Sequence, residues 1–240
     1  MKTRILGIAG LTAVLLGASV VAQRLTAEQV LDKAEAAAGG AKIRTLKSIH
    51  VKGIFQAPAQ KLSGTIEIYF KAPNKVLLRQ TIPGVLEQTS GFDGKVGWEK
   101  SNMTGLREIK GKELEQLKSA ANFTSVGNWR KQYRNPRLRG VQQLGNHEVY
   151  VIDLTTTHGT KATLYIDTRE FLVRRDDSEV VTPQGSIVAT SLLEDYRRVD
   201  GIMYPFRVRQ QVSGMESVIY LQQVRHNVPI NDSLFRKPKQ

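Results

Sequence analysis

Residues 192–212 (LLEDYRRVDGIMYPFRVRQQV) constrain the fold most, because they predict two antiparallel strands joined by a tight turn. Asp-Gly between apolar-rich runs is the strongest short-range hairpin signal, since a type I′ turn needs positive φ at both central residues. A turn at Asp200-Gly201 would place Val199 opposite Ile202. The pairs that follow would alternate between hydrogen-bonded and non-hydrogen-bonded types.

Pro205 is compatible with this hairpin. It would lie opposite Tyr196, at a pair that exchanges no hydrogen bonds, so its missing amide interrupts only the pairing with the next strand outward. Beyond Pro205 the side chains alternate between an apolar face (Phe206, Val208, Val212) and a polar face (Arg207, Arg209, Gln211). The pattern predicts a sheet with one buried and one exposed face.

The same alternation recurs along most of the chain and is strictest in residues 62–71. Turn residues at short intervals favour antiparallel pairing over βαβ units, and we expect ten or eleven strands. The predicted fold class is mainly β (α+β), with a single antiparallel sheet in one domain, residues 23–240. Such a sheet must curl, meet a second sheet or take up helices to cover its apolar face.

Three segments predict helices. Thr26 and Gln29 form a capping box, and Gly39-Gly40 ends the helix that they begin. Residues 110–122 combine helix formers with a helical apolar spacing, and residues 129–133 predict a second short helix.

The first 22 residues predict a secretory signal peptide. Lys2 and Arg4 precede the apolar run 5–18, and Val20-Val21-Ala22 supplies small residues for cleavage after Ala22. An uncleaved membrane anchor is the alternative, although the run is short for a membrane-spanning helix. We expect an exported protein of a bacterial periplasm.

The composition limits the classes of partner. Without cysteine, the chain forms no disulfide and no thiolate metal site. The net charge is +13, of which Lys2 and Arg4 contribute two, leaving +11 after cleavage. Nucleic acid is not an expected partner, because the chain is exported and lacks aromatic residues interleaved with the basic ones. Anionic lipid headgroups would suit this charge, and a solvated basic surface is equally compatible with it.

No catalytic, metal or cofactor site is predicted. None of the four histidines stands in a paired metal-ligand spacing, and no G-x-S-x-G nucleophile motif occurs. We therefore do not expect an enzyme.

The apolar strand faces and the helices inserted between strands supply the candidate site. If the sheet curls, its inward side chains form a surface that can hold an acyl chain, at about 0.8 kcal/mol for each buried methylene. A solid core filled by the same side chains is the competing interpretation. The candidate lipid-binding residues are Val51, Phe55, Ile66, Ile68, Phe70, Leu78, Trp98, Phe206 and Val208. The candidate lid residues are Leu114, Leu117, Phe123 and Trp129.

Several segments resemble the LolA-like outer-membrane lipoprotein-sorting proteins of the bacterial periplasm. They are residues 28–40 (EQVLDKAEAAAGG), 64–75 (GTIEIYFKAPNK), 91–98 (GFDGKVGW), 103–105, 195–206 (DYRRVDGIMYPF) and 226–235 (HNVPINDSLF). The resemblance implies an incomplete β-barrel with a helical lid over a hydrophobic concave surface. It implies a periplasmic carrier that shelters the acyl chains of a lipoprotein or lipid on the way to the outer membrane. The arginine that locks the lid in well-studied carriers cannot be aligned to one position here. An alternative within the same fold is an envelope sensor or scaffold that binds a protein partner.

Overall fold

The structure is a computed structural model of the 240-residue chain, and it describes residues 25–157, 159–182 and 185–239. The expected signal peptide, residues 1–22, lies outside the described residues. In the part of the chain that is described, no helix is both long enough and apolar enough to cross a membrane.

The helices begin and end close to the predicted positions. They are α1 (Ala27–Ala38), α2 (Gly40–Ile43), α3 (Gly111–Ala121) and α4 (Trp129–Gln132), with 3-10 turns η1 (Pro58–Gln60), η2 (Phe123–Gly127) and η3 (Asp232–Phe235). The capping box of α1 is confirmed. The Thr26 amide donates to Gln29 Oε1 at 2.9 Å, and the Gln29 amide donates to Thr26 Oγ1 at 3.2 Å. Gly39 ends α1 with a φ of 88°, a conformation that favours glycine.

Thirteen strands form one sheet. The first six are β1 (Ser48–Ala57), β2 (Leu62–Lys71), β3 (Lys75–Ile82), β4 (Leu86–Phe92), β5 (Gly97–Ser101) and β6 (Gly105–Ile109). The other seven are β7 (Tyr133–Leu144), β8 (His147–Thr156), β9 (Lys161–Asp167), β10 (Val173–Thr182), β11 (Gly185–Val199), β12 (Ile202–Val212) and β13 (Met215–His226). The expected ten or eleven strands were too few.

The predicted hairpin is confirmed in turn and register. Asp200 and Gly201 have φ values of 48° and 84°, and Val199 pairs with Ile202. Tyr196 pairs with Pro205, also as predicted. Pairing between β12 and β13 starts only beyond Pro205, at Arg207 and Tyr220.

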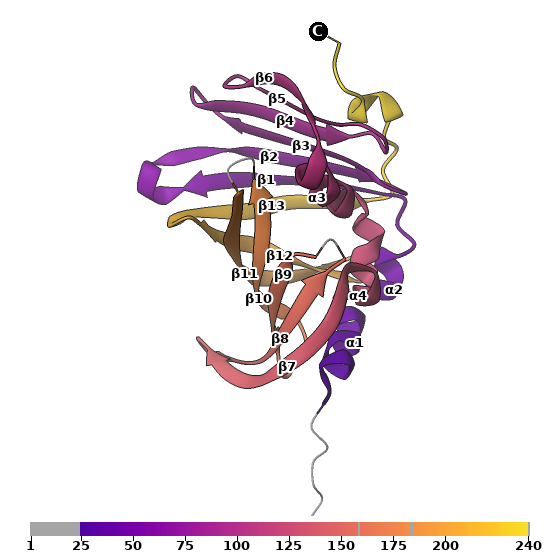
Figure 1. The fold of residues 1–240 in the computed structure, drawn as a ribbon, viewed down its shortest axis with the longest axis vertical. Coiled ribbons are helices and arrows are strands. Elements are labelled where there is room, and N and C mark those ends of the chain that lie inside the picture. The colour runs from indigo at the N-terminus through magenta and orange to yellow at the C-terminus, as the bar shows by residue number, and fades with distance from the viewer. Residues whose placement is uncertain (1–24, 158, 183–184, 240) are drawn as a thin grey trace, which may run out of the picture.

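The strand order is β6-β5-β4-β3-β2-β1-β13-β12-β11-β10-β9-β8-β7, with antiparallel pairs throughout. The first and last strands of the chain, β1 and β13, therefore pair in the middle of the sheet. The sheet stays open at β6 and β7, and it bends around the helices, which lie along one side (Figure 1). The predicted fold class, a single curved antiparallel sheet with few helices, is confirmed.

The helices cover one face of the sheet, which we call the concave face. Val30, Leu31 and Ala34 of α1 pack on β8 and β9, where Ile152 and Leu164 are buried with them. A second buried cluster combines α2 and η2 with β1, β12 and β13. A third places α3 against β3 and β4. These clusters fix the positions of the helices over both halves of the sheet.

Candidate functional site

Eight of the nine candidate lipid-binding residues lie on the concave face. Directly paired residues of neighbouring strands share a face. The register pairs Val51 with Ile68 and Ile68 with Leu78, and the same analysis places Phe55, Ile66, Phe70, Phe206 and Val208 on that face. The alternation in the sequence predicted these faces correctly.

Trp98 is the exception, and its assignment to this surface was wrong. It pairs with Gly91 and lies on the opposite face, where it is buried with Leu77 and Phe235. Its indole Nε1 donates to the main-chain carbonyl of Phe235 at 2.8 Å. The C-terminal turn η3 thus covers Trp98, a contact between distant segments that strand alternation cannot reveal.

Part of the concave face is not covered by the helices. Val51, Ile66 and Phe206 are buried, but Phe55, Ile68 and Leu78 remain half-buried. Val208 is also half-buried, and so are two neighbours in register with it, Leu193 and Ile219, which were not predicted. We call Phe55, Ile68, Leu78, Leu193, Val208 and Ile219 the central apolar surface.

Most of this surface is not part of the core. Of its six members, only Ile68 packs against a buried cluster of the described residues. Leu193 and Ile219 could have been identified from the alternation within β11 and β13, had the cross-strand register been known. The middle of the concave face therefore carries apolar side chains that are partly exposed and mostly outside the buried clusters.

All four candidate lid residues lie over the concave face. Leu114 and Leu117 pack against Val76 and Phe92. Phe123 is buried in the cluster that includes Val51 and Phe206, and its ring centroid lies 5.6 Å from that of Phe70. Trp129 is buried further along, in the cluster built on α1. We call residues 111–132 the lid.

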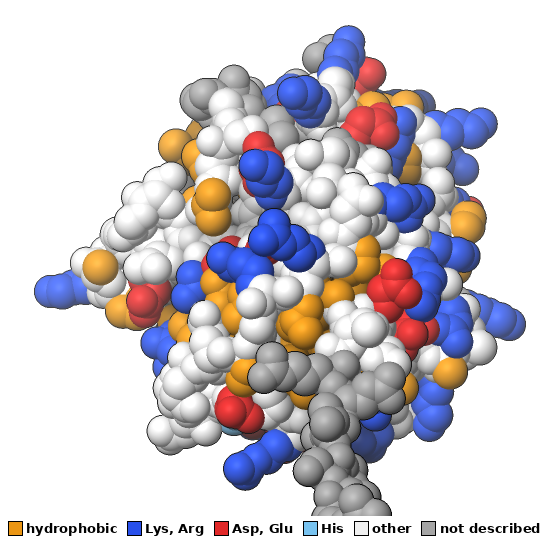
Figure 2. Space-filling model, turned by 60° about the horizontal axis from the view of Figure 1, so that its bottom comes forward, with side chains coloured by type: hydrophobic (Ala, Val, Ile, Leu, Met, Phe, Trp, Pro, Cys, Tyr) orange, Lys and Arg blue, Asp and Glu red, His pale blue; other side chains and the backbone are white. Residues whose placement is uncertain are grey.

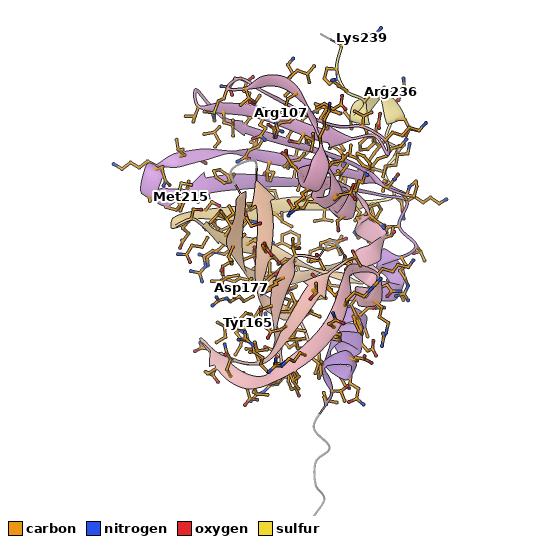
Figure 3. The ribbon with its side chains drawn as sticks, in the orientation of Figure 1. Arg107, Tyr165, Asp177, Met215, Arg236 and Lys239 are labelled. Atoms are coloured by element: carbon orange, nitrogen blue, oxygen red, sulfur yellow. The ribbon has the colours of Figure 1, made fainter. Side chains whose placement is uncertain are left out.

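Polar contacts fasten the lid near its start. Arg107, in the middle of β6 (labelled in Figure 3), donates two hydrogen bonds to Glu113, of 2.9 and 2.6 Å, and one to Glu99, of 3.0 Å. The hydrogen bonds from Arg107 lower the pKa of Glu113. Bidentate arginine–carboxylate pairs of this kind also fix geometry, so α3 is held in one orientation on the sheet.

A second set of contacts fastens the other end of the lid to α1 and α2. Arg44 pairs with Glu35 at 2.6 Å and donates to the carbonyl of Gly127. The other oxygen of Glu35 accepts from the amide of Trp129 at 3.1 Å. The indole of Trp129 donates to Asp32 at 2.7 Å.

Gly127 allows η2 to approach α2 closely. A Cβ atom on Gly127 would lie 2.4 Å from the carbonyl oxygen of Gly40, nearer than real Cβ contacts. Any side chain at position 127 would therefore push the lid away from α2. The sequence did not identify this close approach.

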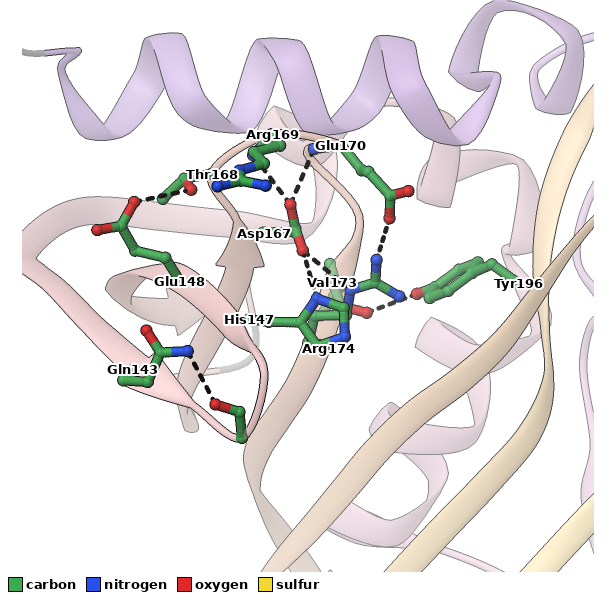
Figure 4. A network of polar contacts seen from close by, with 11 residues as sticks. Gln143, His147, Glu148, Asp167, Thr168, Arg169, Glu170, Val173, Arg174 and Tyr196 are labelled. Atoms are coloured by element: carbon green, nitrogen blue, oxygen red, sulfur yellow. Dashed lines mark hydrogen bonds and ion pairs between the residues drawn. The ribbon is translucent and has the colours of Figure 1, made fainter.

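A separate polar network surrounds Asp167, at the turn between β9 and β10 (Figure 4). Asp167 accepts from the amides of Arg169 and Glu170, both at 2.9 Å, and pairs with His147 at 2.8 Å and Arg174 at 3.3 Å. Burial would raise the pKa of Asp167, but these donors hold it at about 2. The network adjoins a polar pocket of about 490 Å³. Both carboxylate oxygens are already bound, Oδ1 by two amides of the turn and Oδ2 by His147 and Arg174 of the strands β8 and β10, so the network stabilises the turn.

Lys and Arg side chains are spread over the face drawn in Figure 2, with hydrophobic side chains visible between them near its centre.

The described residues contain no group of three or more His, Asp or Glu side chains placed to hold a metal ion.

No protein-family model matches the sequence, and a search of curated proteins finds no match. Solved structures do match. A LolA superfamily protein from Nitrosomonas europaea has a TM-score of 0.58 and 20% identity, covering 89% of this chain and 99% of its own. A DUF1329 family protein from Desulfovibrio piger has a TM-score of 0.58 and 14% identity, covering 86% and 97%.

A third solved structure extends the similarity. A domain from Vibrio parahaemolyticus assigned to outer membrane lipoprotein-sorting proteins has a TM-score of 0.55 and 12% identity, covering 88% of this chain and 96% of its own. Each match spans nearly the whole of the known protein, so the likeness covers the complete sheet and not a fragment of it. The chain has the fold of the LolA superfamily, an open antiparallel sheet with helices along its concave face.

Proposed function

We propose that this protein is an exported carrier that binds the acyl chains of a lipid or lipoprotein on the central apolar surface, next to the lid. The observation that supports it is the set of half-buried apolar side chains in the middle of the concave face, most of them outside the core. Burial of one long acyl chain there would contribute on the order of 10 kcal/mol before the costs of association.

The lid suits this role. Leu114, Leu117 and Phe123 present apolar side chains to the sheet, while polar contacts through Arg107 and Arg44 hold the two ends. Opening the lid would break these polar contacts and separate its apolar side chains from the sheet, while the hydrogen bonds between strands stay in place.

The expected compartment is the periplasm, to which the signal peptide predicted from residues 1–22 would direct the chain. The name of the Vibrio protein, outer membrane lipoprotein-sorting, supports the same class of cargo. A net charge of +11 on the mature chain would favour contact with anionic membrane surfaces during transfer.

Native mass spectrometry with organic extraction, on mature protein from a periplasmic fraction, tests the proposal. We expect a bound mass of phospholipid, fatty acid or acyl-peptide size. Val208→Glu, which places a charge on the central apolar surface, should abolish it, whereas Val188→Glu, at a 63% exposed site on the opposite face, should not. A protein that stays free of lipid after incubation with vesicles, and that co-purifies with an envelope protein, would instead favour the sensor or scaffold function.

A further inference from the structure

A row of polar side chains crosses the concave face beside the central apolar surface. The register pairs Asp176 with Ser191, Ser191 with Gln210, and Gln210 with Ser217, on the adjacent strands β10, β11, β12 and β13. We call these four residues the polar row. Leu193, Val208 and Ile219 lie two residues away along the same strands, which corresponds to about 7 Å.

Asp176 is the only charged member of this row, and it lies on the concave face. It pairs with Leu164 of β9, which is buried under α1. Its neighbour Asp177 points to the other face, beside Tyr165 (Figure 3). One carboxylate of the pair is thus directed toward the lid side and the other toward the outside.

The hydrogen-bonding capacity of the row is largely unused. Asp176 Oδ1 accepts from Ser178 Oγ at 2.5 Å, and no other described side chain or amide donates to Asp176. Within the same described ranges, the side chains of Ser191, Gln210 and Ser217 have no hydrogen-bond partner. All four side chains are half-buried, so their free donors and acceptors can reach the polar group of a ligand on the concave face.

The surroundings of Asp176 favour a ligand group that donates a hydrogen bond to its carboxylate. Burial raises the pKa of Asp176, and the adjacent charge of Asp177 adds to this. No basic side chain pairs with Asp176 among the described residues. The hydroxyl of Tyr133 lies near enough for the Asp176 charge to affect it, and burial together with that charge raises the Tyr133 pKa. An incoming ammonium or hydroxyl group would supply the partner that Asp176 lacks, whereas a carboxylate would be repelled.

We infer that the ligand is a long-chain amphiphile whose head group donates hydrogen bonds, as an ammonium or alcohol does, and that this head group binds the polar row at Asp176. The inference rests on the proposed function, because the alkyl chain would lie on the central apolar surface. The net charge of the protein alone would predict the opposite preference, because a strongly basic protein attracts anionic amphiphiles at long range. A preference for ammonium or alcohol head groups would therefore have to come from Asp176.

Displacement of the apolar fluorophore N-phenylnaphthylamine by dodecylamine, dodecanol and laurate tests this at neutral pH. Wild-type protein should bind the amine and the alcohol more tightly than laurate. Asp176→Asn should weaken amine binding about tenfold and strengthen laurate binding, because the charge is lost while an acceptor remains. It should leave the alcohol nearly unchanged. Asp177→Asn, on the opposite face of the same strand, is the matched control and should keep the wild-type order.

Each outcome decides between the two proposals. Equal affinity for the three amphiphiles, or the same change in Asp177→Asn as in Asp176→Asn, would overturn the head-group inference and leave the carrier function standing. A protein that binds neither the fluorophore nor any of the three amphiphiles would refute the carrier function itself. Circular dichroism of the two variants confirms that any change reflects binding and not unfolding.

Discussion

The guanidinium of Arg44 joins the carboxylate of Glu35 to the main-chain carbonyl of Gly127, and so connects α1 and α2 with the η2 segment of the lid. The Glu35–Arg44 distance is 2.6 Å. These contacts, with the close approach of Gly127 to Gly40, hold the lid against the helices at its C-terminal end.

Replacement of Arg44 by methionine should loosen this end of the lid. We expect loss of about 1 kcal/mol of stability, as for one or two hydrogen bonds, and faster amide exchange in residues 123–129 with unchanged exchange in β1 and β13. Hydrogen exchange measured by mass spectrometry checks this. Arg225→Met, at an exposed position of β13, is the control. Unchanged protection of η2 in Arg44→Met would show that Arg44 does not hold the lid.

Asp176 and Asp177 should respond oppositely to substitution. Burial raises the pKa of Asp176 above its usual 3.8, so the folded state binds its proton more tightly than the unfolded state and stability falls as the pH rises above 3.8. Asp176→Asn should therefore be more stable than wild type at pH 7, by about 1 kcal/mol, and the difference should vanish below pH 3.8. Urea unfolding across pH measures this.

Asp177, the neighbouring carboxylate, should affect stability in the opposite direction. Burial would raise the pKa of Asp177, but hydrogen bonds from Arg175 and Thr190 lower it below 3.8. The ionised Asp177 carboxylate therefore stabilises the folded state above pH 3.8, and this contribution is lost as the pH falls through the lowered pKa. Asp177→Asn should accordingly destabilise the protein at pH 7. Two variants that shift stability in the same direction would contradict the assignment of these side chains to different environments.

Asp167→Asn should destabilise the turn between β9 and β10. The pKa of about 2 against a usual 3.8 corresponds to about 2 kcal/mol of stability at neutral pH. Since the folded-state pKa is depressed, this contribution is complete above pH 3.8 and disappears as the pH falls through about 2. The free energy of unfolding from urea titrations should show a loss at pH 7 that shrinks toward pH 2. Thr168→Ala, in the same turn, is the control and should show no such pH dependence.

The C-terminal turn η3 should stabilise the sheet from the face opposite the concave face. Phe235 is fully buried over Leu77 and Trp98, so Phe235→Ala should cost about 3–5 kcal/mol. Trp98 should then emit at longer wavelength because water reaches its indole, a change best followed in a Trp129→Phe background. Met215→Ala, at a 60% exposed position, should leave both stability and emission unchanged. An unshifted spectrum in Phe235→Ala would mean that η3 does not shield Trp98.

Local patterns identified most of the candidate site, and long-range pairing decided the remainder. The alternation in β2 and β12 correctly placed Ile68 and Val208 on the concave face. Trp98 was misplaced because both faces of β3 and β5 are covered, one by α3 and one by η3, and an apolar residue there does not reveal its side. Arg44 could not be selected in advance, since its partners Glu35 and Gly127 are brought together only by the packing of α1, α2 and η2.

By itself, the sequence determined the turn at Asp200-Gly201, the register of its hairpin and the cap of α1, because these depend on φ preferences and hydrogen bonds between residues close in the chain. The tertiary structure decided that β1 pairs with β13 and that Asp176, Ser191, Gln210 and Ser217 stand in one row. A row across four strands can be predicted only if the register of each pair of adjacent strands is known. Each register is set by the burial of apolar faces against distant helices, which no local pattern contains.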